Sequence, residues 1–268
     1  MSDILVDEPA QGVKRLTLNR PESLNAFTFG MYSQLIGIFE ALRHDSRTRV
    51  VILTGSGKGF CAGHDLRNAG QPAWIDDPQM SRPYNGKYSI SEIGRIPVLM
   101  RQLPQPVICA VNGAAAGIGY ALALAADLCV AAKSAKFVNS IHNAGTGHEL
   151  GLSYLLPRAV GTQRAAEILL TARPVLADEA ERIGLVLRTV PDEQLMQFAL
   201  ELAAAIMVNV PIGIWLTKQS LWLNQSAGSL DAAIEMENRA VAISQSTADA
   251  AEKRAAFLEK RAPKFSNT

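Results

Sequence analysis

The sequence predicts an α/β fold in which helices cover a mostly parallel sheet. Two short apolar runs, residues 50–54 and 107–111, are typical of strands that are buried on both faces. Strands, turns and helical segments alternate along the first part of the chain, and this order implies parallel strands joined through helices. The remainder is almost wholly helical. We therefore divide the chain into an α/β core, residues 1–205, and a C-terminal helical region, residues 206–268.

The first half of the chain contains strands, helices and one long polar segment. Residues 13–18 alternate in part and end at Asn19-Arg20-Pro21, which predicts a strand closed by a turn. Residues 26–43 carry apolar side chains at helical spacing and predict a helix. Residues 68–89 are polar and rich in Pro, Gly and Asp, and this length predicts a mobile lid or a loop shaped by a ligand. A helix follows at 91–103 and ends before Pro104.

The second half is dominated by helices. Residues 117–126 are rich in small side chains, which predicts a helix packed tightly against its neighbours, and strands are expected at 128–131 and 136–138. Further helices are expected at 150–160, 163–171, 177–183, 192–205, 212–224 and 229–260. In a parallel sheet the chemistry takes place where strands end and helices begin, so residues 54–66 and 111–121 are the candidate site segments.

Charge and cysteine usage exclude several classes of protein. The 268 residues carry 26 Lys and Arg against 25 Asp and Glu, so a net charge of +1 gives no electrostatic reason to expect nucleic acid or a membrane surface as partner. The first nine residues have no basic segment of the secretory type, and the apolar stretch 107–132 is too interrupted to predict a membrane span. Cys61, Cys109 and Cys129 lie in apolar runs and predict buried thiols of a reducing compartment, so we expect a cytoplasmic protein.

The first candidate turn is the segment 58–66. Gly63 can adopt backbone angles closed to other residues, which would leave the following N–H pointing into a cleft. Asp65 could fix this turn by accepting hydrogen bonds from nearby backbone N–H groups. The alternative is an ordinary surface turn that contains an incidental histidine.

The second candidate turn is Gly117-Ile118-Gly119, at the expected start of a helix. Unpaired N–H donors at the positive end of a helix suit an anion, either a phosphate or a developing oxyanion. The alternative is close packing between helix and sheet. The glycine spacing fits neither the dinucleotide-binding fingerprint nor the nucleotide-binding P-loop, so both are excluded.

Several motifs occur in order along the chain: Asn19-Arg20-Pro21, Leu24-Asn25-Ala26, residues 60–66, residues 111–113 and residues 125–128. Together they resemble the crotonase (enoyl-CoA hydratase/isomerase) superfamily, and the similarity continues through 155–161, 180–185 and 254–265. The resemblance implies a spiral of ββα units with C-terminal helices that build a homotrimer or a dimer of trimers. It also implies a coenzyme A thioester as substrate, no permanently bound cofactor or metal, and a place in fatty acid metabolism.

The resemblance also implies the location of the site. The backbone N–H groups of His64 and Ile118 would form an oxyanion hole for a thioester enolate, although the family usually has glycine at the second position. Leu24 and Ala26 resemble positions that line the adenine and pantetheine site. Lysines that could contact coenzyme A phosphates, or be solvated instead, are Lys218, Lys260 and Lys264, the last two from a neighbouring subunit. The positions that would line the thioester site are Ala62, Gly63, Asp65, Leu66, Gly117 and Gly119.

One departure from the family pattern decides between reactions. The two glutamates that hydratases of the superfamily use fall on Ala121 and Ile141 here, and neither residue can move a proton. Glu149 remains at the start of a predicted helix, where relatives that isomerise or dehalogenate acyl-CoA carry a catalytic acid. We therefore predict double-bond isomerisation with Glu149 as the proton shuttle.

Other interpretations of these residues remain open. Glu149 could instead be an acidic residue favoured by the helix dipole or a partner of an arginine. The chain could be a hydratase with a non-standard base, an enzyme of thioester hydrolysis or C–C cleavage, or a non-catalytic acyl-CoA-binding subunit. His64, His142 and His148 lack the spacing of metal ligands and could assist proton transfer or line a pocket.

Overall fold

Six strands form the main sheet, in the order β1-β2-β3-β5-β7-β10. The computed structural model describes residues 2–75, 79, 81–140, 145 and 147–267. Strand β1 pairs antiparallel with β2, and every later pair in this sheet is parallel, so the predicted α/β fold is confirmed. The strands are β1 Ile4–Ala10, β2 Val13–Leu18, β3 Val50–Gly55, β5 Val107–Val111, β7 Leu128–Ala132 and β10 Arg188–Val190.

A second, four-stranded sheet runs in the order β4-β6-β8-β9. Its strands are β4 Gly59–Cys61, β6 Ala114–Ala116, β8 Lys136–Val138 and β9 Val175–Leu176. Strands β4, β6 and β8 are parallel, whereas β9 pairs antiparallel with β8. Sequence analysis did not predict β4 and β6, because each has three residues and lies within a glycine-containing motif.

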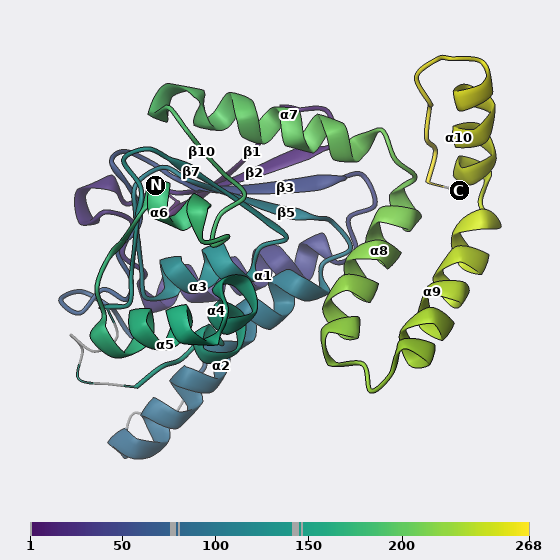
Figure 1. Ribbon diagram of the computed structural model, residues 1–268. Helices are drawn as coiled ribbons and strands as arrows, with labels where there is room; N and C mark the ends of the chain where they lie inside the picture. Colours follow the sequence, from purple (N-terminus) through teal and green to yellow (C-terminus); the bar gives the residue numbers. More distant parts are fainter. Residues whose placement is uncertain (1, 76–78, 80, 141–144, 146, 268) are drawn as a thin grey trace.

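Helices cover both faces of the main sheet (Figure 1). Successive side chains of β3 point to opposite faces of the sheet. Val51 and Leu53 pack in the larger apolar cluster, whereas Val50 and Ile52 pack in the cluster that includes residues of α7, Leu195–Met207. This double burial explains why the first four residues of β3, VVIL, are all apolar. The helices on the other face are α1 Phe29–Leu42, α2 Arg82–Gln102, α3 Ile118–Ala125, α4 Leu152–Val160, α5 Thr162–Thr171 and α6 Ala177–Arg182.

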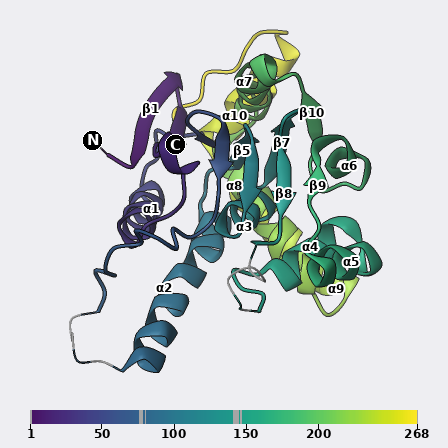
Figure 2. The same cartoon turned by 90° about the vertical axis from the view of Figure 1, so that its left-hand side faces the viewer.

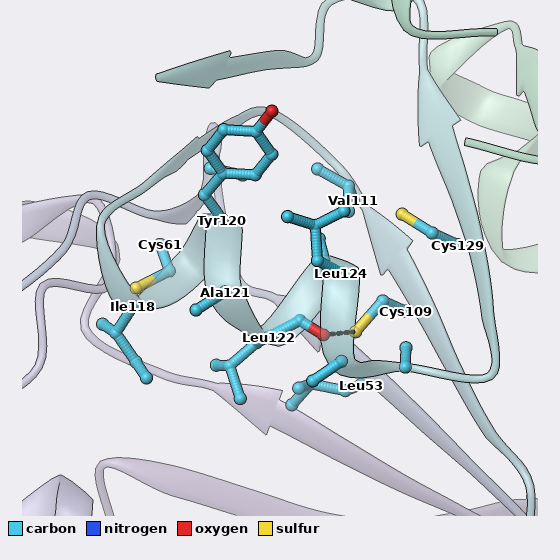
Figure 3. Packing of buried hydrophobic residues seen from close by; sticks show 14 of the residues in the cluster. Leu53, Cys61, Cys109, Val111, Ile118, Tyr120, Ala121, Leu122, Leu124 and Cys129 are labelled. Carbon is cyan, nitrogen blue, oxygen red and sulfur yellow. Dashed lines mark hydrogen bonds between the residues drawn. The ribbon is translucent and has the colours of Figure 1, made fainter. Parts of the chain in front are cut away.

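Helix α3 is short, and all its residues are buried. Figure 3 shows Leu122 near Leu53, and Cys109 donating its thiol hydrogen bond to the Leu122 carbonyl, at 3.5 Å. All three cysteines are free and buried, as the sequence predicted. Burial raises the pKa of Cys61 to about 12, which keeps this thiol protonated at neutral pH.

Two predicted boundaries were wrong. Helix α2 begins at Arg82 rather than at residue 91, because Ser81 is extended and Pro83 starts the first turn, where its missing N–H costs nothing. The predicted lid therefore ends before residue 82. The single helix expected at 229–260 is two helices, α9 Leu230–Gln245 and α10 Ala248–Leu258, because the Thr247 side chain caps α10 by accepting a hydrogen bond from the Ala250 N–H at 3.2 Å.

The C-terminal region extends from the core as an arm of three helices, α8 Pro211–Leu223, α9 and α10 (Figures 1 and 2). The domain boundary predicted at residues 205 and 206 falls in the last turn of α7. Among the helices of the described residues, none is both long enough and apolar enough to cross a membrane by itself. Residues Asp192–Met207 and Pro211–Ser226 pass that test only as a pair, bent by 106°.

Candidate active site

The two glycine turns leave the second sheet at the same edge. Strands β4 and β6 are parallel neighbours, with Cys61 paired to Ala115, so the chain emerges from both in the same direction. Gly63 and Gly117 then take positive φ angles of 104° and 51°. A Cβ placed on Gly117 would lie 3.4 Å from the Gly63 Cα. The two turns that the sequence singled out are therefore in contact.

Each turn presents a backbone donor. Ile118 is the first residue of α3, where an N–H has no partner within the helix. His64 lies in an isolated parallel bridge with Phe27, and this bridge uses the carbonyl of Gly63 and the N–H of Asp65 but leaves the His64 N–H out. Within the described part of the chain, neither the His64 nor the Ile118 N–H donates to a backbone carbonyl.

Gly119 allows the two turns to approach each other. A Cβ at this position would lie 2.6 Å from the Cys61 carbonyl oxygen and 2.7 Å from the Cys61 Cβ. Real Cβ atoms do not approach so closely, so α3 can pack against β4 only with glycine here. Close packing and donor presentation are therefore not alternatives in this turn, because the same glycine motif does both.

Asp65 fixes the first turn. Its carboxylate accepts hydrogen bonds from the backbone N–H groups of Asn68 at 2.8 Å and Arg67 at 3.1 Å, and from Arg20 Nη1 at 3.0 Å. The bond from Asn68, with smaller contributions from Arg20 and Arg67, lowers the pKa of Asp65, so the carboxylate stays ionised at neutral pH. The turn is thus held by a buried, paired anion.

The N-terminal turn is tied to the same network. Arg20 also donates to the Ala26 carbonyl at 2.5 Å, and the Ala62 N–H donates to the Leu24 carbonyl at 2.9 Å. Leu24 itself is in the left-handed region, with φ of 51°. Leu66, by contrast, is 74% exposed. The structure therefore brings Leu24, Ala26 and Ala62 together beside the Gly63 turn.

Glu149 lies three residues before α4 and is half-buried. Burial raises the pKa of its carboxyl group, and among the described residues no arginine or lysine counteracts this shift. The negative charge of Glu149 is among the causes that raise the pKa of Tyr32, after burial and Cys61. Since the Tyr32 hydroxyl is 3.4 Å from His64 Nδ1, Glu149 acts electrostatically on the group that contacts the first turn.

Sequence analysis missed Tyr32, which belongs to α1. Its ring is 2% exposed and stacks on the His64 ring, with centroids 5.8 Å apart and planes at 21°. The sequence did indicate that Tyr32 is buried, because it lies beside Met31 and Leu35 in the apolar stripe of a predicted helix. A hydroxyl on a buried stripe must find a partner, but the sequence does not say which one.

Other predicted residues do not join the site. Lys218, a candidate for phosphate contact, is buried instead: its ammonium pairs with Asp127 at 2.7 Å and donates to the carbonyls of Met100 and Gln105 at 3.0 and 2.9 Å. This prediction was wrong, because the lysine sits on the face of α8 that meets the core. Ala121 lies in α3 and is fully buried in the apolar core.

The C-terminal lysines also lie away from the glycine turns of their own chain. Lys260 and Lys264 are exposed beyond α10. The end of this segment docks at the amino end of β3, where Asn267 Nδ2 donates to the Ser46 carbonyl at 2.9 Å. The glycine turns follow the carboxyl ends of the strands. His148 is exposed, and Ile141 and His142 lie outside the described residues.

A cavity of about 860 Å³ lies at that amino end, between the core and α8, and includes Arg49, Trp215 and Trp222 in its lining. It is separated by the length of the main sheet from the glycine turns, so it is not the predicted thioester site. Across the residues that the structure describes, no group of three or more His, Cys, Asp or Glu side chains could hold a metal ion.

Comparison with known proteins agrees with this geometry. The family model for enoyl-CoA hydratase/isomerase matches residues 8–268. A probable enoyl-CoA hydratase of Mycobacterium tuberculosis is 44% identical over 269 residues, covering 100% of this chain and 94% of that protein. The chain therefore belongs to the enoyl-CoA hydratase/isomerase family, whose substrates are coenzyme A thioesters.

Two solved structures extend the comparison. A probable enoyl-CoA hydratase/isomerase from Mycobacterium abscessus superposes with a TM-score of 0.91 at 39% identity, covering 100% of both chains. A monofunctional enoyl-CoA isomerase from Mycobacterium smegmatis has a TM-score of 0.72 at 42% identity, covering 87% of this chain and 98% of that one. These structures share the crotonase fold, so the predicted fold family is confirmed.

Proposed function

We propose that this chain moves the double bond of 3-enoyl-CoA thioesters into conjugation with the thioester. The N–H groups of His64 and Ile118 bind the thioester oxygen, and Glu149 carries the proton. The contact between the Gly63 and Gly117 turns is the observation that supports this most directly. It brings close together two segments whose N–H groups, at His64 and Ile118, have no backbone partner among the described residues. One preorganised donor of an oxyanion hole is worth about 3 kcal/mol of transition-state stabilisation in enzymes where it has been removed.

The reaction balances with one carboxylate. The C2–H bond breaks, its proton passes to Glu149, and its electron pair enters the thioester, whose oxygen becomes the bound enolate oxyanion. The enolate then takes the proton from Glu149 at C4, and the double bond moves from C3–C4 to C2–C3. Glu149 ends as it began, ionised. A carboxyl group with a raised pKa suits both steps, because it is a stronger base than an ordinary glutamate and still releases the proton.

Hydration is less well supported. Addition of water needs a second group to orient and split the water, and Ala121 offers only a methyl group on a fully buried helix. Glu149 is the better candidate for the base, because burial raises its pKa. Asp65, the acid within the first turn, is already engaged by backbone N–H groups and by Arg20.

We test the proposal with purified protein on 3-enoyl-CoA and 2-enoyl-CoA, comparing wild type with Glu149→Gln. The matched control is Glu193→Gln, which changes an exposed glutamate. Isomerisation that is lost only in Glu149→Gln supports the proposal. Hydration that survives in Glu149→Gln identifies a hydratase with another base. Retained acyl-CoA binding without turnover by the wild type identifies a binding subunit.

We also propose that the C-terminal arm joins copies of the chain in a trimer or a dimer of trimers. Eight large apolar side chains on the three helices of the arm are exposed, and exposed apolar surface of this kind often marks an interface between copies. Light scattering is expected to give a mass three or six times 28.8 kDa, which Phe257→Asp lowers. A monomeric wild type refutes this. The exposed apolar side chains of the arm are Leu221, Leu223, Leu230, Ile234, Val241, Ile243, Phe257 and Leu258.

A further inference from the structure

The His64 imidazole is held on two sides by aromatic rings. Tyr32 stacks on it, and Phe29 meets it edge-on, with centroids 5.2 Å apart and planes at 65°. The Tyr32 hydroxyl is 3.4 Å from Nδ1, a long hydrogen bond. Three contacts therefore fix a side chain whose own backbone N–H is the first proposed donor.

The backbone around His64 is fixed by the same segment of chain. The Phe27 N–H donates to the Gly63 carbonyl at 2.7 Å, and the Asp65 N–H donates to the Phe27 carbonyl at 2.9 Å. His64 thus lies between two anchored residues. Because the allowed side-chain rotamer of a residue depends on its backbone angles, holding the ring also restricts the backbone at His64.

The contact also favours a particular pairing of donor and acceptor if His64 is neutral. Burial lowers the pKa of His64 more than Asp65 raises it, so the ring is neutral at neutral pH. Burial, Cys61 and Glu149 together raise the pKa of Tyr32 well above its ordinary value, so the phenol keeps its proton and can donate it to Nδ1. A neutral imidazole that accepts at Nδ1 carries its own proton on Nε2.

We propose that Tyr32 is a positioning residue of the oxyanion hole: through its stacking and its hydroxyl contact at Nδ1, it holds the His64 ring and thereby the His64 N–H donor. This role rests on the proposed function, since it serves the same thioester oxygen. Tyr32 itself does not contact substrate in this role. The hydroxyl makes its contact with Nδ1, and the ring is buried.

Tyr32→Phe isolates the hydroxyl, because it keeps the stacked ring. A donor displaced by about half an ångström is expected to lower kcat about tenfold. KM is expected to be unchanged, since the acyl and coenzyme A contacts remain. The effect must vanish in a His64→Ala background, because Tyr32 acts through the ring that this substitution removes. Equal effects in both backgrounds overturn the proposal.

A second measurement does not depend on activity. In protein labelled with ¹⁵N-histidine, the His64 ring is expected to show an unprotonated Nδ1 and a protonated Nε2, and Tyr32→Phe is expected to abolish this preference. The matched control is Tyr120→Phe, which removes a buried hydroxyl that has no partner among the described residues and is expected to leave His64 unchanged. A tautomer preference with no isomerase activity keeps the proposed contact and refutes the function. An unaltered His64 tautomer in Tyr32→Phe refutes the contact.

Discussion

Gly119→Ala is the substitution whose effect can be worked out most fully from the structure. The new Cβ would meet the Cys61 carbonyl oxygen at 2.6 Å, about 0.8 Å short of ordinary contact at 3.4 Å. Because Cys61 is the last residue of β4, the separation that relieves this overlap moves the Gly63 turn away from α3. The two proposed donors then no longer converge on one oxygen.

The two energetic effects of this change oppose each other. Alanine is favoured over glycine inside a helix by about 1 kcal/mol. Overpacking a buried contact against backbone costs about 1–3 kcal/mol, so we expect a small net loss of stability. Activity is expected to fall further, because a displacement of 1 Å costs about 100-fold in rate; a displacement of about 0.8 Å gives about a 40-fold loss of kcat/KM.

Kinetics with 3-enoyl-CoA and urea unfolding of the same preparations measure both effects. Gly37→Ala is the matched control, since Gly37 also lies within a helix and a Cβ there would meet nothing within 4 Å. This control is expected to gain about 1 kcal/mol and to keep full activity. If Gly119→Ala is as active as wild type and more stable, the close contact between α3 and β4 does not set the donors.

Further predictions follow from the buried charges. Because burial raises the pKa of Glu149, kcat/KM for isomerisation is expected to fall on acidification at a pH above the ordinary value of 4.5; a profile flat down to that pH contradicts Glu149 as the base. A carboxyl group with a raised pKa destabilises the folded state when it is ionised, and this loss of stability appears as the pH rises from 4.5 through the raised pKa. At pH 7, Glu149→Gln is therefore expected to unfold at a urea concentration no lower than wild type. Lys218→Met leaves Asp127 without its buried partner and is expected to lower the free energy of unfolding in urea by about 3–5 kcal/mol. The matched control Lys133→Met changes an exposed lysine and is expected to lower it little. Equal losses in both variants refute a stabilising role for the Lys218–Asp127 ion pair.

The parts of the fold that sequence analysis predicted are those whose pattern is set by burial. Residues 13–18 form β2 at the predicted bounds, and the largely apolar strands β3 and β5 are parallel neighbours. Strands β4 and β6 were missed, because each has only three residues and lies within a glycine-containing motif that predicts a turn. The pairing of β4 with β6 is a long-range contact that local sequence does not predict, and this pairing brings Gly63 and Gly117 together.

Side-chain roles were harder to predict than backbone ones. Asp65 accepts the backbone N–H bonds that its place in the turn predicted, because both partners are within three residues of it. Lys218 was misjudged, since its partner Asp127 is far away in sequence and only the docking of α8 brings them together. Tyr32 was missed for the same reason, as its contact with His64 spans 32 positions of the chain.

The most direct test of the account follows a deuterium label placed at C2 of 3-enoyl-CoA. If Glu149 alone removes the proton from C2 and returns it at C4, part of the label appears at C4 of the 2-enoyl-CoA product, and Glu149→Gln forms neither product nor transferred label. Turnover by Glu149→Gln at the rate of wild type, with the label lost to solvent, would contradict the account.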